Sequence, residues 1–181
     1  LGSYNASKHA VKGFTDSFRI ELQMNDEPVS VTLIQPSAIG TPFPQHARNT
    51  TGYQASLPKP IYAPDVVARA ILDAAQNQRR DVVVGGAGKF QIFGSNAFPL
   101  LFDKIAASMA DQLINREKPV PEQKGNLLAP QGDDGDVEGR QHGRHFSVTT
   151  ASGRHPWLTL GTLAALAAAS LFAITGGRSR A

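Results

Sequence analysis

Hydrophobic residues recur at helical spacing in the first part of the chain. Between residues 5 and 24 the apolar positions fall mostly three or four apart, which predicts an amphipathic helix. These positions are Ala6, Ala10, Val11, Phe14, Phe18 and Leu22. The polar run Asn25-Asp26-Glu27-Pro28 ends the helix. Residues 29–34 are rich in β-branched side chains, which predicts a short buried strand that Pro36 stops.

The alternation of helix and strand returns further along the chain. Pro64 suits the first position of a helix. The apolar stripe of this predicted helix consists of Val66, Val67, Ala70, Ile71, Ala74 and Ala75. Residues 81–86 predict a second buried strand, and residues 90–117 are mostly helical in pattern, with a start or kink at Pro99. Helices that alternate with strands are typical of an α/β domain built on a parallel sheet.

Two segments lack the pattern of a packed element. Residues 42–62 form a long connection rich in Pro, Asn, Thr and Gly, and connections of this length are usually lids or disordered. Residues 118–156 are dominated by Pro, Gly and charged side chains, which is the composition of a flexible linker. We therefore expect one structured domain over residues 1–117, followed by a linker over 118–156.

Residues 157–175 contain no charged side chain over 19 positions. As a helix this segment would be about 28 Å long, close to the roughly 30 Å thickness of the bilayer hydrocarbon. Arg154 and Arg178 flank it, and Trp157 suits a membrane interface. The segment predicts a C-terminal transmembrane helix, with a buried soluble helix as the alternative.

Composition excludes several classes of function. The net charge is +3, and the basic residues are scattered, so no nucleic-acid site is predicted. The absence of cysteine excludes disulfides and thiolate metal sites. The acidic run 133–138 lacks the spacing of a calcium loop, and we predict no metal site. The segment 85–89 lacks the spacing of a nucleotide-triphosphate loop, so a glycine-dependent turn is the better interpretation.

Tyr4 and Lys8 are the candidate catalytic residues, and the alternative is a half-buried aromatic residue beside a solvated lysine. Positions four apart lie on one face of a helix, so the phenol and the ammonium group are predicted to point into one site. A free tyrosine hydroxyl has a pKa of about 10, too high for a base at neutral pH. A positive charge within about 4–6 Å stabilises the phenolate. Such a tyrosine can take a proton from an alcohol or return one to a carbonyl oxygen.

Two segments carry a resemblance to a known family. The first, residues 4–14, reads YNASKHAVKGF, and the second, residues 34–41, reads IQPSAIGT. Together they resemble the active-site helix and a following motif of the short-chain dehydrogenase/reductase (SDR) family, in the right order and at the expected distance. The resemblance runs from residue 1 to about residue 90 and covers only the later part of that family's domain. It implies the C-terminal portion of a doubly wound parallel-sheet (Rossmann) fold.

The resemblance also implies roles for individual residues. Tyr4 would be the general acid/base, and Lys8 would assist it and hydrogen-bond the nicotinamide ribose. The residues that would contact the nicotinamide end of the cofactor are Pro36, Ser37, Ile39 and Thr41. Ser37 stands where the family usually has glycine, so a positive φ at this position would strain the backbone. The 42–62 connection would cover the substrate, with Phe43, His46 and Tyr53 as candidate wall residues.

The function implied is NAD- or NADP-dependent interconversion of a small-molecule alcohol and a carbonyl compound by hydride transfer. The family's glycine-rich phosphate-binding turn and its catalytic serine are expected upstream of Tyr4 and are not in this sequence, so we expect the chain to be inactive alone. Members of the family commonly form homo-oligomers, so the resemblance implies a homo-oligomer. The C-terminal segment implies a cytoplasmic protein associated with a membrane. The alternative is a non-catalytic, membrane-tethered interaction module derived from a reductase.

Overall fold

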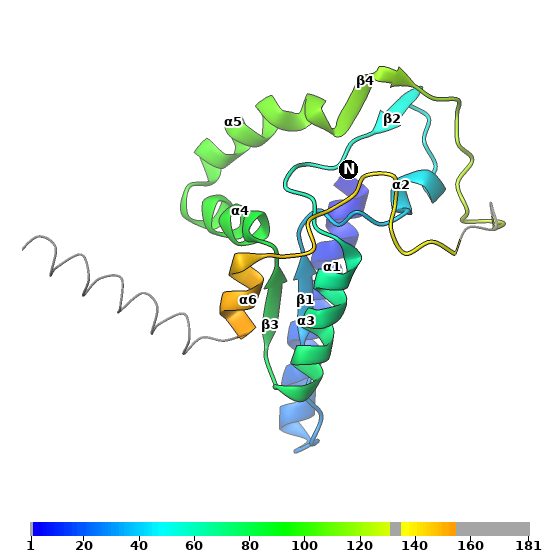
Figure 1. The fold of residues 1–181 in the computed structure, drawn as a ribbon. Coiled ribbons are helices and arrows are strands. Elements are labelled where there is room, and N and C mark those ends of the chain that lie inside the picture. Colours follow the sequence, from blue (N-terminus) through cyan, green and yellow to red (C-terminus); the bar gives the residue numbers. More distant parts are fainter. Residues whose placement is uncertain (1, 131–134, 155–181) are drawn as a thin grey trace, which may run out of the picture.

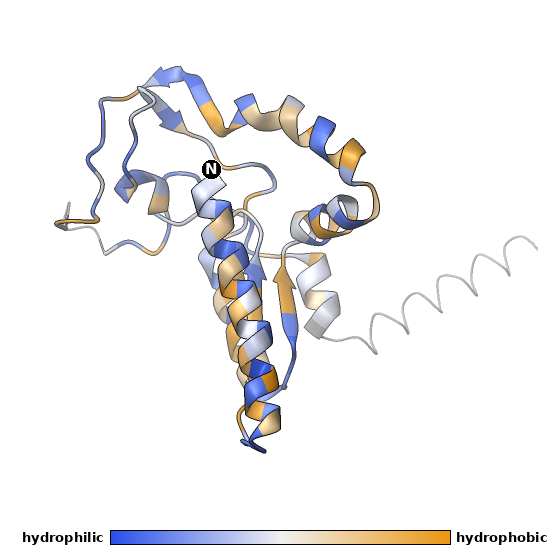
Figure 2. Ribbon diagram, turned by 180° about the vertical axis from the view of Figure 1, so that it is seen from behind, coloured by the Kyte–Doolittle hydropathy of each residue, from blue (hydrophilic) through white to orange (hydrophobic). Residues whose placement is uncertain are grey.

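A pair of parallel strands lies at the centre of the domain, with a long helix on each face. The computed structural model describes residues 2–130 and 135–154. Strand β1 (Leu33–Pro36) pairs in parallel with β3 (Asp81–Val84), with Leu33 opposite Asp81. Helix α3 lies in front of the pair in Figure 1, and α1 lies in front of it when the molecule is seen from behind in Figure 2. The expected α/β class with parallel strands is therefore confirmed.

Helix α3 (Pro64–Gln76) connects the two strands and supplies most of the core. Pro64 occupies its first turn, as the sequence predicts. Its three buried residues, Val66, Ala70 and Ala74, follow one stripe. Val66 and Ala70 pack with Val84, which is fully buried. The buried stripe is narrower than predicted, because Ile71 and Ala75 are exposed.

Strand β1 begins later than the predicted strand over residues 29–34. Its ladder starts at Leu33, whose partner Asp81 is the first residue of β3. Just before this point, the Thr32 hydroxyl donates to the Arg79 carbonyl at 2.6 Å, a side-chain contact outside the ladder. The first residue of β1 is thus set by the first residue of its partner β3. The hydrophobic pattern within residues 29–34 does not show this. Pro36 is the last residue of the strand, as predicted.

The segment predicted as helical over residues 90–117 is divided into several elements. Helix α4 (Gly86–Ala97) is followed by α5 (Pro99–Met109) and a short 3₁₀ turn, η1 (Ala110–Leu113). Phe98 separates the helices with an extended φ of −137°, and Pro99 then starts α5. A proline suits the first turn of a helix but not its interior, which explains the break.

The end of that segment is a strand, which corrects the helical prediction there. Strand β4 (Ile114–Pro119) pairs antiparallel with β2 (Tyr53–Ala55), which lies in the 42–62 connection after the short helix α2 (Phe43–His46). The two strands are about sixty residues apart in sequence, so local periodicity gives no sign of their pairing.

The expectation of a flexible linker over 118–156 is also corrected for its described residues. Residues 135–147, here named the strap, run along the body of the domain. The Gly139 N–H donates to the Gly40 carbonyl at 2.8 Å, and the Arg144 N–H donates to the Ile61 carbonyl at 2.9 Å. Helix α6 (Val148–Arg154) follows and packs against α3, α4 and β3. Glycine allows this close contact between backbones, because a Cβ at Gly139 or Gly143 would collide with main-chain atoms of the body.

The predicted transmembrane segment, residues 157–175, lies outside the described residues. Among the helices in residues 2–130 and 135–154, none is long and apolar enough to cross a bilayer.

Candidate active site

Tyr4 and Lys8 lie on one face of the first turns of helix α1 (Gly2–Met24). The Lys8 ammonium nitrogen is 5.3 Å from the centroid of the Tyr4 ring, within the range of a cation–π contact. Tyr4 is half exposed. The helix runs antiparallel to β1, which brings these turns to the end of the molecule where the parallel strands finish (Figure 1).

The buried side chain of Arg19 connects helix α1 to the two strands. Arg19 is the buried residue of this helix, and its side chain is 8% exposed. Its guanidinium donates to the carbonyl of Val31 at 2.9 Å and to the carbonyl of Arg80. It also pairs with Asp16 at 2.9 Å. Because the contacts reach both the start of β1 and the start of β3, they fix the position of α1 along the strand pair.

Asp16 joins this anchor to two further cations. Its carboxylate pairs with Lys12 at 2.6 Å and with Arg80 at 2.8 Å. The hydrogen bond from Lys12 lowers the pKa of Asp16 below its ordinary value, with the charges of Arg80 and Arg19 acting in the same direction and desolvation opposing them. At neutral pH the carboxylate is ionised and pairs with Arg19 as well as with these two cations.

The loop after β1 turns away at Ser37 without backbone strain. The Ser37 N–H donates to the Val84 carbonyl at 2.8 Å, and its hydroxyl accepts the Gly88 N–H at 2.9 Å. Of the non-glycine residues that the structure describes, only Asp26 has a positive φ. The serine at the family's glycine position therefore keeps an ordinary conformation and gains a hydrogen bond.

Ile39 and Thr41 follow in the same loop. Ile39 forms a parallel bridge with Tyr62, and the Gly40 N–H donates to the Tyr62 carbonyl at 2.9 Å. The Ile39 N–H and the Thr41 hydroxyl take part in none of the hydrogen bonds found within residues 2–130 and 135–154. These two donors fit a group with hydrogen-bond acceptors, such as the carboxamide or phosphate of a nicotinamide cofactor.

The glycine turn after β3 uses its amide groups within the protein. The Gly85 N–H donates to the Thr150 hydroxyl at 3.0 Å, and the Gly86 N–H donates to the Tyr62 hydroxyl at 3.2 Å. Gly85 has a φ of +97°, which favours glycine. These contacts agree with the interpretation of this segment as a glycine-dependent turn. Both N–H groups are hydrogen-bonded within the protein and so do not form a phosphate-binding loop.

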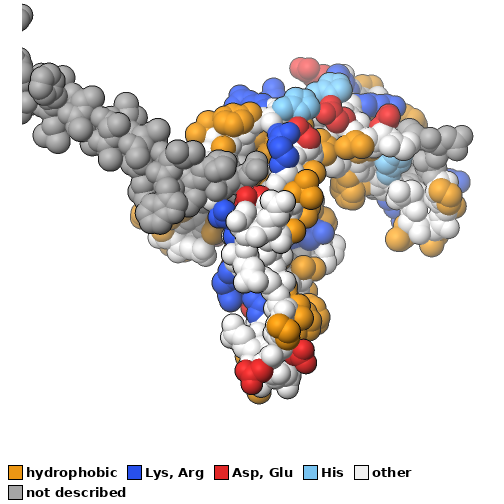
Figure 3. Space-filling model, turned by 60° about the horizontal axis from the view of Figure 1, so that its bottom comes forward, with side chains coloured by type: hydrophobic (Ala, Val, Ile, Leu, Met, Phe, Trp, Pro, Cys, Tyr) orange, Lys and Arg blue, Asp and Glu red, His pale blue; other side chains and the backbone are white. Residues whose placement is uncertain are grey.

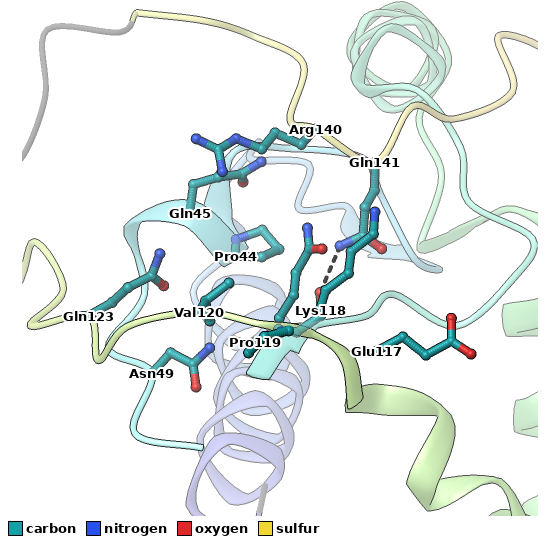
Figure 4. A pocket seen from close by; sticks show the side chains of 12 residues that line it. Pro44, Gln45, Asn49, Glu117, Lys118, Pro119, Val120, Gln123, Arg140 and Gln141 are labelled. Carbon is teal, nitrogen blue, oxygen red and sulfur yellow. Dashed lines mark hydrogen bonds between the residues drawn. The ribbon is translucent and has the colours of Figure 1, made fainter. Parts of the chain in front are cut away.

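A polar cavity of about 430 Å³ lies between the 42–62 connection, β4 and the strap. Figure 4 shows several of its side chains. Among the lining residues are Gln45, Asn49, Gln54, Lys118, Arg140 and Gln141. The candidate wall residues Phe43, His46 and Tyr53 do not line this cavity; their neighbours in α2 and β2 do.

Gln141 ties the strap to the 42–62 connection. Its side-chain amide donates to the Ala55 carbonyl at 2.9 Å, the dashed line in Figure 4, and its oxygen accepts the Leu57 N–H at 2.9 Å. Sequence reasoning missed Gln141, Arg19 and Tyr62, because each acts on a partner distant in sequence. The sequence holds only weak indications of these contacts. Arg19 lies within a helical apolar pattern, and Gly139 and Gly143 lie on either side of Gln141.

The geometry defines an α/β domain with a tyrosine–lysine pair at the carboxyl end of a parallel strand pair. The uncharacterized oxidoreductase YxnA of Bacillus subtilis is 33% identical over 169 residues, which are 92% of this chain and 48% of that protein. SadH of Mycobacterium tuberculosis, named an oxidoreductase, is 31% identical over 90 residues, or 46% of this chain and 33% of that protein. A Drosophila melanogaster protein named dehydrogenase/reductase SDR family protein 7-like is 29% identical over 121 residues, or 64% of this chain and 36% of that protein.

These relatives confirm the resemblance carried by the Tyr4–Lys8 segment. The chain is similar to proteins named as oxidoreductases, one of which is named as an SDR family protein. It spans about half the length of YxnA and about a third of the other two relatives. No protein-family model and no solved structure matches it.

Proposed function

We propose that this chain carries the proton-transfer half of an NAD- or NADP-dependent oxidoreductase that interconverts an alcohol and a carbonyl compound. The observation that carries the proposal is the Tyr4–Lys8 pair, with the ammonium 5.3 Å from the ring centroid at the open start of α1. The sequence similarity to proteins named as oxidoreductases supports an oxidation–reduction reaction.

Tyr4 exchanges the proton. In oxidation its phenolate oxygen takes the hydroxyl proton of the alcohol, and in reduction its phenol returns a proton to the carbonyl oxygen. The Lys8 ammonium stabilises the negative charge on the phenolate. When bound, the nicotinamide cofactor supplies the hydride donor or acceptor.

Pro36 at the end of β1 and three residues of the loop that follows hold the cofactor in this proposal. Ser37 fixes the loop through Gly88, while the Ile39 N–H and the Thr41 hydroxyl serve as donors. Pro36 ends β1 and directs the chain outward at the edge where ligands bind in doubly wound folds. The 42–62 connection, tied down by Gln141, walls the substrate side.

The assembly and location are further proposals. Phe14 and Phe18 stack at a centroid distance of 5.8 Å on α1, and Phe14 is exposed. An exposed aromatic pair is typical of a surface that another subunit covers, so we propose a homo-oligomer. We also propose a cytoplasmic enzyme that residues 157–175 tether to a membrane.

The test is Tyr4→Phe in the full-length protein that contains this chain. We expect loss of turnover of at least about 100-fold, because the proton donor and acceptor is removed. Titration with NADH and with NADPH should show unchanged cofactor binding and should also identify the preferred cofactor. Ser108→Ala is the control, because it also removes one hydroxyl, from an exposed position on α5, and it should keep full activity. Normal turnover by the Tyr4→Phe protein would show that this assignment is wrong.

A further inference from the structure

Helices α4 and α5 expose an unusually apolar surface, here named the α4–α5 face. Leu100 is 79% exposed and Phe93 is 62% exposed. The face also includes Phe90, Leu101, Ile105 and Met109, all exposed. Figure 3 shows some hydrophobic side chains on the side of the molecule where α4 and α5 lie, and others elsewhere in the same view. Soluble proteins rarely expose an apolar patch of this kind unless it contacts another phase or a partner.

The two helices hold this face in a fixed arrangement. Gly94 of α4 lies against the Phe102 ring of α5, so that a Cβ at Gly94 would meet the ring at 3.3 Å. Phe93 and Phe98 make an edge contact at a centroid distance of 6.3 Å across the break between the helices. Phe102 is turned toward α4 and is partly buried, whereas Leu100 and Leu101 remain exposed. The exposed residues therefore belong to a defined outer side of a packed helix pair.

The chain leaves the described body beside this face. Helix α6 packs against α4, and Lys89 of α4 donates to the Thr149 carbonyl at 3.4 Å. Thr150 and Gly153 connect α6 to the ends of β3 and α3, through Gly85 and Arg79. The uncharged stretch 157–175 begins three residues after Arg154, the end of α6. The body and this stretch are thus separated by a few residues and not by a long flexible linker.

The geometry points to a lipid bilayer as the surface that covers the α4–α5 face. A 19-residue uncharged segment that enters a bilayer would hold α6, and therefore α4, at the membrane surface. Exposed Phe and Leu side chains on the neighbouring helices then gain stabilisation by entering the boundary between headgroups and acyl chains. We propose that the α4–α5 face rests in this interfacial layer beside the insertion point of residues 157–175.

The single tryptophan of the chain makes a sharp test possible. Trp157 lies in the uncharged stretch, and Trp157→Phe removes the native signal. In that background, Leu100→Trp places a reporter on the α4–α5 face. Leu127→Trp places the matched control at a residue that is 92% exposed, in the segment after β4. In Figure 1 this segment runs on the side of the molecule away from α4. Both proteins are mixed with phosphatidylcholine–phosphatidylglycerol vesicles whose acyl chains carry bromine, which quenches tryptophan on contact. Unchanged far-ultraviolet circular dichroism verifies the fold.

We expect the Leu100→Trp protein to lose most of its fluorescence and the Leu127→Trp protein to keep it. The chain with its native Trp157 should also be quenched. Quenching of Trp157 alone would overturn the proposal, since the chain would then be tethered with its face away from the lipid. Equal quenching of both reporters would overturn it as well. A blue shift of the Leu100→Trp emission without vesicles, together with dimers in sedimentation, would assign the face to a second copy of the chain. None of these readouts depends on turnover, so their failure leaves the role of Tyr4 untouched.

Discussion

Helices α1 and α3 flank the same strand pair but are held in opposite ways. Helix α3 buries three apolar residues against the strands. Helix α1 is nearly twice as long, yet Arg19 is its one buried residue among those the structure describes. The helix that carries the candidate catalytic pair is thus held by charge and hydrogen bonds, and the helix that carries none is held by apolar packing. The comparison indicates that stability and positioning of the site depend on different residues.

Ala70→Asp should have the largest effect, because it places an unpaired carboxylate in the core. Ala70 is 1% exposed and packs with Val66 and Val84. Burial of an unpaired ion costs of the order of several kcal/mol. Urea unfolding should show a loss of this size or a protein that does not fold. Ala75→Asp is the matched control, because Ala75 is exposed on the same helix and should tolerate the charge. Equal losses in both variants would contradict the assigned packing of α3.

Arg19→Met should have an intermediate effect, and it tests the other side of the comparison. Methionine keeps the apolar part of the side chain but removes the donor of the Val31 carbonyl, while the Arg80 carbonyl keeps the Leu33 N–H at 3.0 Å. Loss of the partner of a partly buried acceptor, here the Val31 carbonyl, costs up to about 1–3 kcal/mol in the free energy of unfolding. Lys12→Met is the control, because Lys12 is exposed and should contribute little. In the full-length protein we also expect turnover to fall with Arg19→Met. Full stability of the Arg19→Met protein would show that α1 is held by other contacts.

The pH dependence should be the smallest effect, and it comes from Asp16. Its pKa is lowered from an ordinary 3.8, first by the hydrogen bond from Lys12. A carboxylate with a lowered pKa in the folded state adds stability that is present above about pH 4 and lost as pH falls through the folded pKa. Asp16→Asn should therefore be less stable than the unmodified protein at neutral pH. The two unfolding curves should converge at low pH, and a constant difference at every pH would contradict this account.

Asp65 adds a similar dependence at the start of α3. Desolvation raises its pKa, but the hydrogen bonds from Arg69 and His145 outweigh this and leave the pKa lowered. The acid sensitivity that remains in Asp16→Asn should therefore decrease further in the double variant with Asp65→Asn. Urea titrations between acid and neutral pH measure both contributions.

Local sequence predicted the elements whose stabilising partners are close in the chain. Pro64 and the stripe that follows it placed α3, and the β-branched run placed β3, because periodicity and propensity are local properties. The same reasoning put Tyr4 and Lys8 on one face of a helix, since positions four apart coincide on any helix. It misplaced β4 and the strap, because the pairing of β4 with β2 and the contact of Gly139 with Gly40 depend on residues far away in sequence.

The sequence by itself determined the candidate catalytic pair, a phenol and an ammonium one helical turn apart, and the segments that resemble the SDR family. Only the tertiary structure decided what holds that pair in place. Arg19 reaches a carbonyl 61 residues further along the chain, and Gln141 reaches back 86 residues to the connection beside the polar cavity. Such contacts form only after the chain has folded, because the groups that satisfy a buried guanidinium or amide are brought together by packing and not by spacing along the chain.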